Sequence, residues 1–272
     1  MAITINNNIP SLQANRQINK QSKEIGDSFD KLSSGLRINK ASADPAGLAV
    51  ALDLLATADI SSVASRNISD GVSLTAIADG ALESAGEITG RMSELATQAA
   101  NGTLSDEQRT ALNNEYQQLK SELDRIAQTT EFNDQKLLAQ DNTISLQAGT
   151  SGNGSSQVVL SLPGVSSSSL GMPANISSQA NAQSAIDQIA TARDNISQAR
   201  GAIGASASRF ETAYNNLQTS EINQREAASR IRDVDVAQES SNLVANRIRE
   251  QMSAAMSSQA NLLPNLALKL LG

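Results

Sequence analysis

The sequence predicts a mainly α-helical protein: a long antiparallel helical bundle or coiled coil with one small β-hairpin. Three observations lead to this fold class. Apolar residues recur at alternating spacings of three and four along most of the chain, the period of a helix that packs along one face. Aromatic residues make up only 2% of the 272 residues, which favours thin bundles of close helices over a thick core. The charge-free stretch 142–186 holds two short runs rich in β-branched residues.

The first and last parts of the chain each carry an apolar helical stripe. The N-terminal stripe is a heptad seam with one polar member, formed by Ile18, Ser22, Ile25, Phe29, Leu32 and Leu36. The C-terminal stripe is formed by Val244, Ile248, Met252 and Ala255. A leucine-rich end follows it, and Pro264 within that end is expected to bend or interrupt the last helix.

A much longer helix is predicted to begin near Asp44. Asp44 is a good N-cap, Pro45 suits the first helical position, and Asn101-Gly102 is a typical stop. A continuous helix between these points would have about 55 residues and a length of about 80 Å. Its apolar stripe comprises Ile77, Ala81, Ala85, Ile88, Met92, Leu95 and Ala99.

Two more helices and the hairpin complete the expected layout. Ser105 to Gln108 have the pattern of a capped helix start, and an apolar stripe then continues to Ile126. The runs TISLQAG and QVVLSLPG, separated by the turn-rich SGNGSS, predict a β-hairpin near 142–163. The most regular helical pattern follows, with two arginines at seam positions: Ile186, Ile189, Arg193, Ile196, Arg200, Ile203, Ala207, Phe210, Tyr214 and Leu217.

Composition excludes several classes of function. The chain has no Cys and no His, which excludes disulfides, Cys/His metal sites, cysteine nucleophiles and histidine acid–base catalysis. Composition alone leaves catalysis by carboxylates open. We expect no enzyme, no metal site and no cofactor. The net charge of −7 argues against nucleic-acid binding, which needs a basic surface. The N-terminus lacks the pattern of a cleaved signal peptide, and no uninterrupted apolar run is long enough for a membrane span.

The two ends differ from the middle in charge. Residues 1–40 carry six basic and three acidic side chains, residues 225–272 carry six and five, and the middle carries nine and twenty. The ends also hold more apolar surface than two paired helices can cover. Three interpretations fit this pattern: an ordinary coiled coil with apolar ends, a polymer subunit that buries its ends against copies of itself, or another secreted helical protein. The residues expected to carry self-assembly are Ile18, Ile25, Phe29, Leu32, Leu36, Val244, Ile248, Met252, Leu262, Leu263 and Leu266.

Several long motifs in the order of the chain resemble those of bacterial flagellins. At the N-terminal side they are KLSSGLRINKASADPAGLAV (31–50), SRNISDGVSL (65–74) and GALESAGEITGRMSELATQAANGT (80–103). LDRIAQTTEFNDQKLL (123–138) resembles the family's turn after the third helix. ASRIRDVDVAQESSNL (228–243) and SSQANLLPNLALKLLG (257–272) resemble the C-terminal motifs. The resemblance covers nearly the whole chain, and with its short middle the chain resembles a minimal flagellin without large variable outer domains.

The resemblance implies a structural subunit of the flagellar filament, a secreted homopolymer located outside the cell. It implies that residues 1–43 and 232–272 pair as an inner coiled-coil domain at the filament lumen, and that 44–231 form an outer helical rod with the hairpin. The implied partners are other copies of the chain, an export chaperone, the filament cap and a junction protein, with neither nucleic acid nor membrane. The alternative is the related hook–filament junction protein itself.

The family also implies a contact with an innate immune receptor, Toll-like receptor 5. The matching residues in this chain are Arg91, Leu95 and Glu115. Leu95 also lies on the apolar stripe of its helix, so a role in the core is the alternative for that residue. Arg91 and Glu115 could instead form a solvated face or contact another subunit.

Overall fold

The computed structural model describes residues 7–149 and 151–271, with the backbone alone described for 263–271. The long helices and the main hairpin occur where the sequence predicts them. In chain order the elements are α1 (Ile9–Ser34), α2 (Pro45–Ala99), α3 (Asp106–Thr129), β1 (Glu131–Phe132), β2 (Gln135–Lys136), β3 (Asn142–Gln147), the 3-10 turn η1 (Gly154–Ser156), β4 (Gln157–Leu162), α4 (Gln179–Arg232) and α5 (Val236–Leu271). Helix α2 has the expected 55 residues.

The chain divides into two compact units. Residues 1–56 and 223–272 form one, here called the terminal unit, and residues 57–222 form the other, the central unit. The division falls within α2 and α4, further along the chain than the expected boundary at residue 44 and before the one at 231. In the terminal unit the segment after α1 is bonded to the segment before α5, because Leu36 bridges Asp233 and the Val234 N–H donates to the Gly35 carbonyl at 3.0 Å.

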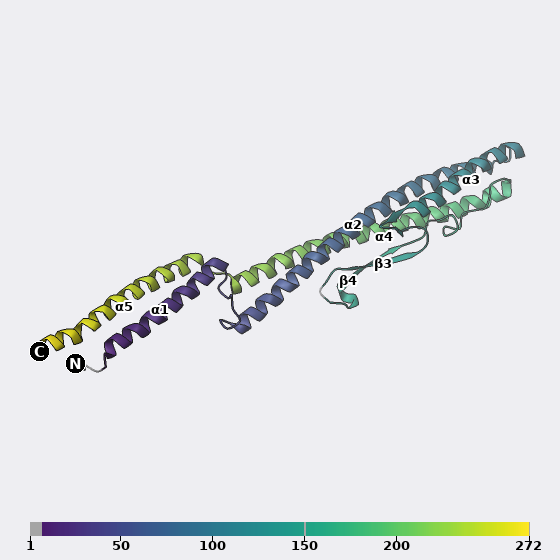
Figure 1. The fold of residues 1–272 in the computed structure, drawn as a ribbon. Helices are drawn as coiled ribbons and strands as arrows, with labels where there is room; N and C mark the ends of the chain where they lie inside the picture. The colour runs from purple at the N-terminus through teal and green to yellow at the C-terminus, as the bar shows by residue number, and fades with distance from the viewer. Residues whose placement is uncertain (1–6, 150, 272) are drawn as a thin grey trace. The chain divides into compact units, whose positions relative to one another are not determined.

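The central unit contains the hydrophobic core of the chain, between α2, α3, α4 and the main hairpin (Figure 1). Many of its α2 and α4 residues are alanines, which let the helices approach closely. The largest fully buried side chains are Tyr116 of α3 and Phe210 of α4. Arg200, one of the two seam arginines, does not enter this core: its guanidinium pairs with Asp79 of α2 at 2.9 Å, and this bond raises the Arg200 pKa.

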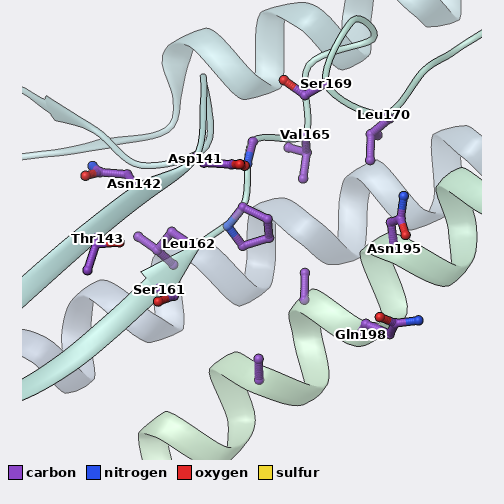
Figure 2. Close-up of a pocket in the computed structure, with 14 residues that line it drawn as sticks. Asp141, Asn142, Thr143, Ser161, Leu162, Val165, Ser169, Leu170, Asn195 and Gln198 are labelled. Atoms are coloured by element: carbon purple, nitrogen blue, oxygen red, sulfur yellow. The ribbon is translucent and has the colours of Figure 1, made fainter.

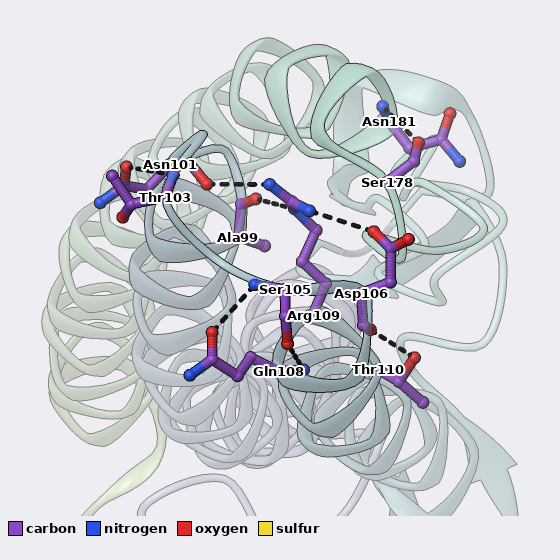
Figure 3. A network of polar contacts seen from close by, with 10 residues as sticks. All are labelled: Ala99, Asn101, Thr103, Ser105, Asp106, Gln108, Arg109, Thr110, Ser178 and Asn181. Atoms are coloured by element: carbon purple, nitrogen blue, oxygen red, sulfur yellow. Dashed lines mark hydrogen bonds and ion pairs between the residues drawn. The ribbon is translucent and has the colours of Figure 1, made fainter.

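The turn between α2 and α3 is held by side chains of α3 and of the turn itself (Figure 3). Ser105 caps α3 in a capping box with Gln108, as the sequence predicts. Arg109 is nearly buried, and its guanidinium donates to the carbonyls of Ala99 and Asn101 at 3.1 and 3.0 Å. The Ala99 carbonyl ends α2 and the Asn101 carbonyl lies in the turn, so Arg109 bonds to the C-terminal end of α2 and ties α3 to it.

The main hairpin pairs β3 with β4 in antiparallel register, from Asn142 opposite Leu162 to Gln147 opposite Gln157. It packs onto α2 at Gly71, where a Cβ atom would lie 2.3 Å from a Leu146 methyl carbon. The glycine therefore leaves the space that Leu146 fills. The periodicity did not predict the shorter hairpin β1–β2, whose two turn residues both adopt positive φ.

Helix α2 differs from the expectation about membrane segments. By length and composition it could cross a membrane, since an 18-residue window of it has a mean hydropathy of 1.5 and is only 17% buried. This window contains no long uninterrupted apolar run, because polar residues lie among its apolar ones. The sequence pattern therefore did not predict it. Its outward residues include Val50, Leu52 and Ile60, which are 44 to 52% exposed.

Candidate assembly surface

The terminal unit is an antiparallel pair of helices, α1 and α5, lying side by side (Figure 1). Contacts near both ends of the pair define its register. Near the start of α1, the Asn8 side-chain amide donates to the Ala260 carbonyl of α5 at 3.0 Å. Near the end of α1, the Ser28 hydroxyl donates to the Glu239 carboxylate at 2.6 Å. Lys31 adds an ion pair to the same carboxylate at 3.7 Å.

The seam between these two helices is largely polar. Its positions on each helix are the residues of lowest exposure, and they recur at alternating spacings of three and four. On α1 these are Ser11, Ala14, Ile18, Gln21, Ile25, Ser28 and Leu32. On α5 they are Glu239, Leu243, Asn246, Glu250, Ser253, Ser257 and Ala260. Gln21, only 2% exposed, leaves its side-chain oxygen without a hydrogen-bond partner within the described structure.

The N-terminal seam therefore differs from the predicted one in two members. Ser22 is exposed and Phe29 is 47% exposed, while Gln21 and Ser28 are the buried members instead. The prediction placed the most apolar face of α1 at the seam. In the structure α1 is rotated from that position, so that polar residues face α5. Phe29 lies at the edge of the pair, where the Arg247 guanidinium sits 5.1 Å from the centre of its ring. Ile18, Ile25, Leu32 and Leu36 are half-buried.

The apolar stripe of α5 faces away from α1. Val244, Ile248, Met252 and Leu262 are each more than half exposed. On α1, Leu12 is also 57% exposed. The other two predicted assembly residues, Leu263 and Leu266, lie outside the residues whose side chains are described. The pair thus buries polar groups alongside Ile18, Ile25 and Leu32 and leaves other large apolar side chains exposed, an arrangement suited to packing against a further apolar surface.

The sequence predicts a bend or an interruption of the last helix at Pro264, and the interruption is wrong. Helix α5 continues through this residue to Leu271. A proline inside a helix removes one N–H donor, which would have bonded to the carbonyl four residues earlier. That carbonyl belongs to Ala260, and it receives the Asn8 amide from α1 instead.

The residues of the expected receptor contact lie in the central unit. Arg91 of α2 and Glu115 of α3 are exposed and form an ion pair at 2.8 Å, and Arg91 also pairs with Glu94 at 2.9 Å. The bond to Glu115 is the main cause of a raised Arg91 pKa. Leu95 is 1% exposed within the core, so its side chain supports α2 from inside and is not available to a partner in this conformation.

A hollow on the central unit lies between the base of the main hairpin, the loop that follows it and α4 (Figure 2). It measures about 660 Å³ and is lined by apolar side chains, neutral amides and hydroxyls, together with one carboxylate, that of Asp141. Asp141 accepts the Gly164 N–H at 2.9 Å, and this bond holds the loop that follows the main hairpin. Across the described residues no group of three acidic side chains gathers in the manner of a metal site.

Comparison with known proteins identifies the family. Residues 5–143 match the family model of the bacterial flagellin N-terminal helical region, and residues 186–271 match that of the C-terminal helical region. A flagellin from Halalkalibacterium halodurans is 40% identical over 269 residues, covering 98% of this chain and 99% of its own. A flagellin from Bacillus subtilis is 33% identical, again covering 98% and 99%. A hook-associated protein from Vibrio parahaemolyticus shares the fold, with a TM-score of 0.56 and 14% identity over 70% of this chain and 99% of its own.

Proposed function

This chain belongs to the bacterial flagellin family, and on that premise we propose that the outward apolar residues of α1 and α5 are the surface through which its copies polymerise. Flagellins are the structural subunits of the flagellar filament, the extracellular helical polymer that drives swimming. The observation that carries the proposal is the inverted polarity of the terminal unit, which places Val244, Ile248 and Met252 outside the helix pair.

The energetic argument favours a neighbouring copy as the partner of this surface. Burying one large aliphatic side chain contributes about 1.5–3 kcal/mol. Several such residues on one helix face represent a large gain that the terminal unit does not realise by itself. Because every copy carries the same face, repeated contacts between copies can bury it along a whole filament.

The terminal unit then corresponds to the inner part of the filament and the central unit to the outer part. In this proposal residues 1–43 and 232–272 line the lumen. The apolar outward residues of α2, which resemble a membrane segment in composition, would contact neighbouring subunits. A structural subunit of this kind needs no catalytic site, and an export chaperone, the filament cap and the junction protein would be its other partners. Likeness to the hook-associated protein concerns the fold alone and does not favour the junction role.

Seeded polymerisation tests the proposed surface. Met252→Asp places a charge on the outward face of α5 and should reduce filament growth at least tenfold, while Met252→Leu should grow like the parent. Electron microscopy of the polymer and sedimentation of the remaining monomer measure the effect. If Met252→Asp assembles at the parental rate, the outward face of α5 is not the polymerisation surface.

A second proposal concerns the exposed Arg91–Glu115 pair. We propose that these two side chains contact Toll-like receptor 5 when the monomer is released, with Leu95 holding α2 in place from the core. The pair spans α2 and α3 on the solvent side, so both charges can be reached together.

A receptor-reporter assay with purified monomer tests this second proposal. Arg91→Ala should lose most of the signal. Arg125→Ala serves as the matched control, since Arg125 is another exposed arginine paired with a glutamate on α3. A silent parent protein, or equal signals from Arg91→Ala and the parent, would contradict the contact.

A further inference from the structure

The bond between Asn8 and Ala260 joins two unusual features of the helix pair. Pro264 cannot donate to the Ala260 carbonyl, so that acceptor on α5 is left open to a partner outside its own helix. The Asn8 amide nitrogen donates to this carbonyl at 3.0 Å and lies 3.2 Å from the Asn261 side-chain oxygen. An internal proline therefore creates the acceptor that α1 uses.

Asn8 performs two separate tasks with the two ends of its side chain. Its oxygen accepts the Ser11 N–H at 3.1 Å and so caps the start of α1. Its nitrogen makes the contact with α5. Because the tasks use different atoms, a substitution can remove one and keep the other.

The second polar contact of the pair lies at the other end of α1. Ser28 donates to Glu239, which is 9% exposed and also faces Lys31. The stretch from Asn8 to Ser28 and the stretch from Glu239 to Ala260 are nearly equal in length, about 30 Å at 1.5 Å per residue. Both contacts therefore form together in only one alignment of the two helices.

We propose that these two contacts form a register lock, in which Asn8 and the open Ala260 carbonyl hold one end of the α1–α5 pair and Ser28 and Glu239 hold the other. The seam between them consists largely of small or polar residues, so its apolar packing discriminates weakly against a shift of one helical turn. Buried polar contacts are a known means of specifying register in paired helices. The lock would fix the relative height of the outward apolar residues on α1 and α5. It rests on the proposed polymerisation surface, because assembly requires that height to be the same in every copy.

Disulfide mapping in the full chain reads the register directly, since the sequence has no cysteine of its own. Ala14 and Ser253 line the same groove between the helices, so Ala14→Cys with Ser253→Cys reports the native register. Ala14→Cys with Ser257→Cys reports a shift of one turn. In the parent background we expect the native pair to cross-link and the shifted pair to remain reduced.

Asn8→Asp isolates the contact with α5. Aspartate keeps the oxygen that caps α1 but has no N–H to donate to Ala260. We expect unchanged helicity by far-UV circular dichroism, a several-fold loss of the native cross-link, gain of the shifted one and slower seeded growth. Asn19→Asp is the matched control, because Asn19 is an exposed residue of α1 and the change in charge is the same.

Pro264→Ala gives the sharpest contrast with simple helix propensity. Alanine is the better helix former and supplies an N–H that competes with Asn8 for the Ala260 carbonyl. Propensity alone predicts improved assembly, whereas the register lock predicts more helix together with weaker native cross-linking and slower growth. If Asn8→Asp and Pro264→Ala both keep the parental cross-link pattern, the lock does not exist. Parental cross-links together with parental growth in Met252→Asp would instead contradict the polymerisation surface and leave the lock intact.

Discussion

The central and terminal units use similar helical periodicity with opposite polarity inside. In the central unit the buried seam positions are occupied by apolar residues such as Met92, Ile189 and Phe210. In the terminal unit the buried seam positions include Gln21, Ser28, Glu239 and Asn246, while large apolar residues such as Met252 lie outside. The central unit therefore has a core that can stabilise it without a partner. The terminal unit instead exposes apolar surface, which neighbouring copies cover in the proposed polymerisation.

The largest change in the free energy of unfolding should come from removing a large side chain from the core of the central unit. Phe210 is fully buried among α2, α4 and the hairpin. Phe210→Ala should lower the free energy of unfolding by about 3–5 kcal/mol, as for other buried aromatic truncations. Calorimetry of the monomer measures the loss. Ile222→Ala, at a position 65% exposed, should stay within about 0.5 kcal/mol and is the control.

Replacing a buried polar residue of the seam by an apolar one should stabilise the terminal unit. Gln21 is buried with an unpartnered oxygen, and removing such a group relieves a penalty of about 1–3 kcal/mol. Gln21→Leu should therefore increase the helicity and the unfolding temperature of the terminal helices in the full chain. A loss of stability would mean that Gln21 has a polar partner in solution and that the inverted seam is incorrect.

The docking of the main hairpin can be tested with a matched pair of glycines in α2. Gly71→Ala forces a methyl group against Leu146, whereas Gly80 has open space around the same position. Gly80→Ala should stabilise by about 0.5–1 kcal/mol, because alanine loses less conformational freedom. Gly71→Ala should be less stable than Gly80→Ala by about 1–3 kcal/mol. Equal values from denaturant unfolding would show that the hairpin does not rest on Gly71.

The smallest effect concerns Tyr116, whose hydroxyl donates to the Pro173 carbonyl at 3.0 Å inside the central unit. Burial raises the pKa of Tyr116, so the folded state holds this proton when the unfolded state has lost it. Stability is complete below the unfolded tyrosine pKa of about 10 and should fall as pH rises above it. Tyr116→Phe should lose about 1 kcal/mol at neutral pH and show a weaker decline in alkali. Unfolding curves at several pH values measure both.

The fold could be predicted from sequence where a local signal determined the structure. Asp44-Pro45, Asn101-Gly102 and the Ser105 capping box mark helix ends that agree with the structure, and the turn-rich segment after Ala148 separates β3 from β4. The family motifs identified the function. These signals succeed because caps and turns depend on a few neighbouring residues.

The polarity of the terminal unit could not be predicted in the same way. Periodicity places the most apolar face inward, which is correct only when the protein completes its core by itself. Phe29 and Val244 lie outward, as the proposed polymerisation surface requires. The continuation of α5 through Pro264 could likewise not be predicted. The Asn8 amide, which bonds to the carbonyl that the proline leaves without a donor, lies at the opposite end of the sequence.

Both tyrosines, Tyr116 and Tyr214, belong to the central unit, and the chain has no tryptophan. Intrinsic tyrosine fluorescence therefore reports on the central unit without any label, while the terminal helices are silent in the same spectrum. Tyrosine fluorescence can follow the central unit, and a single dye attached to the terminal unit can follow that unit in the same experiment. Because both tyrosines lie in the central unit, the two units can be monitored separately during assembly.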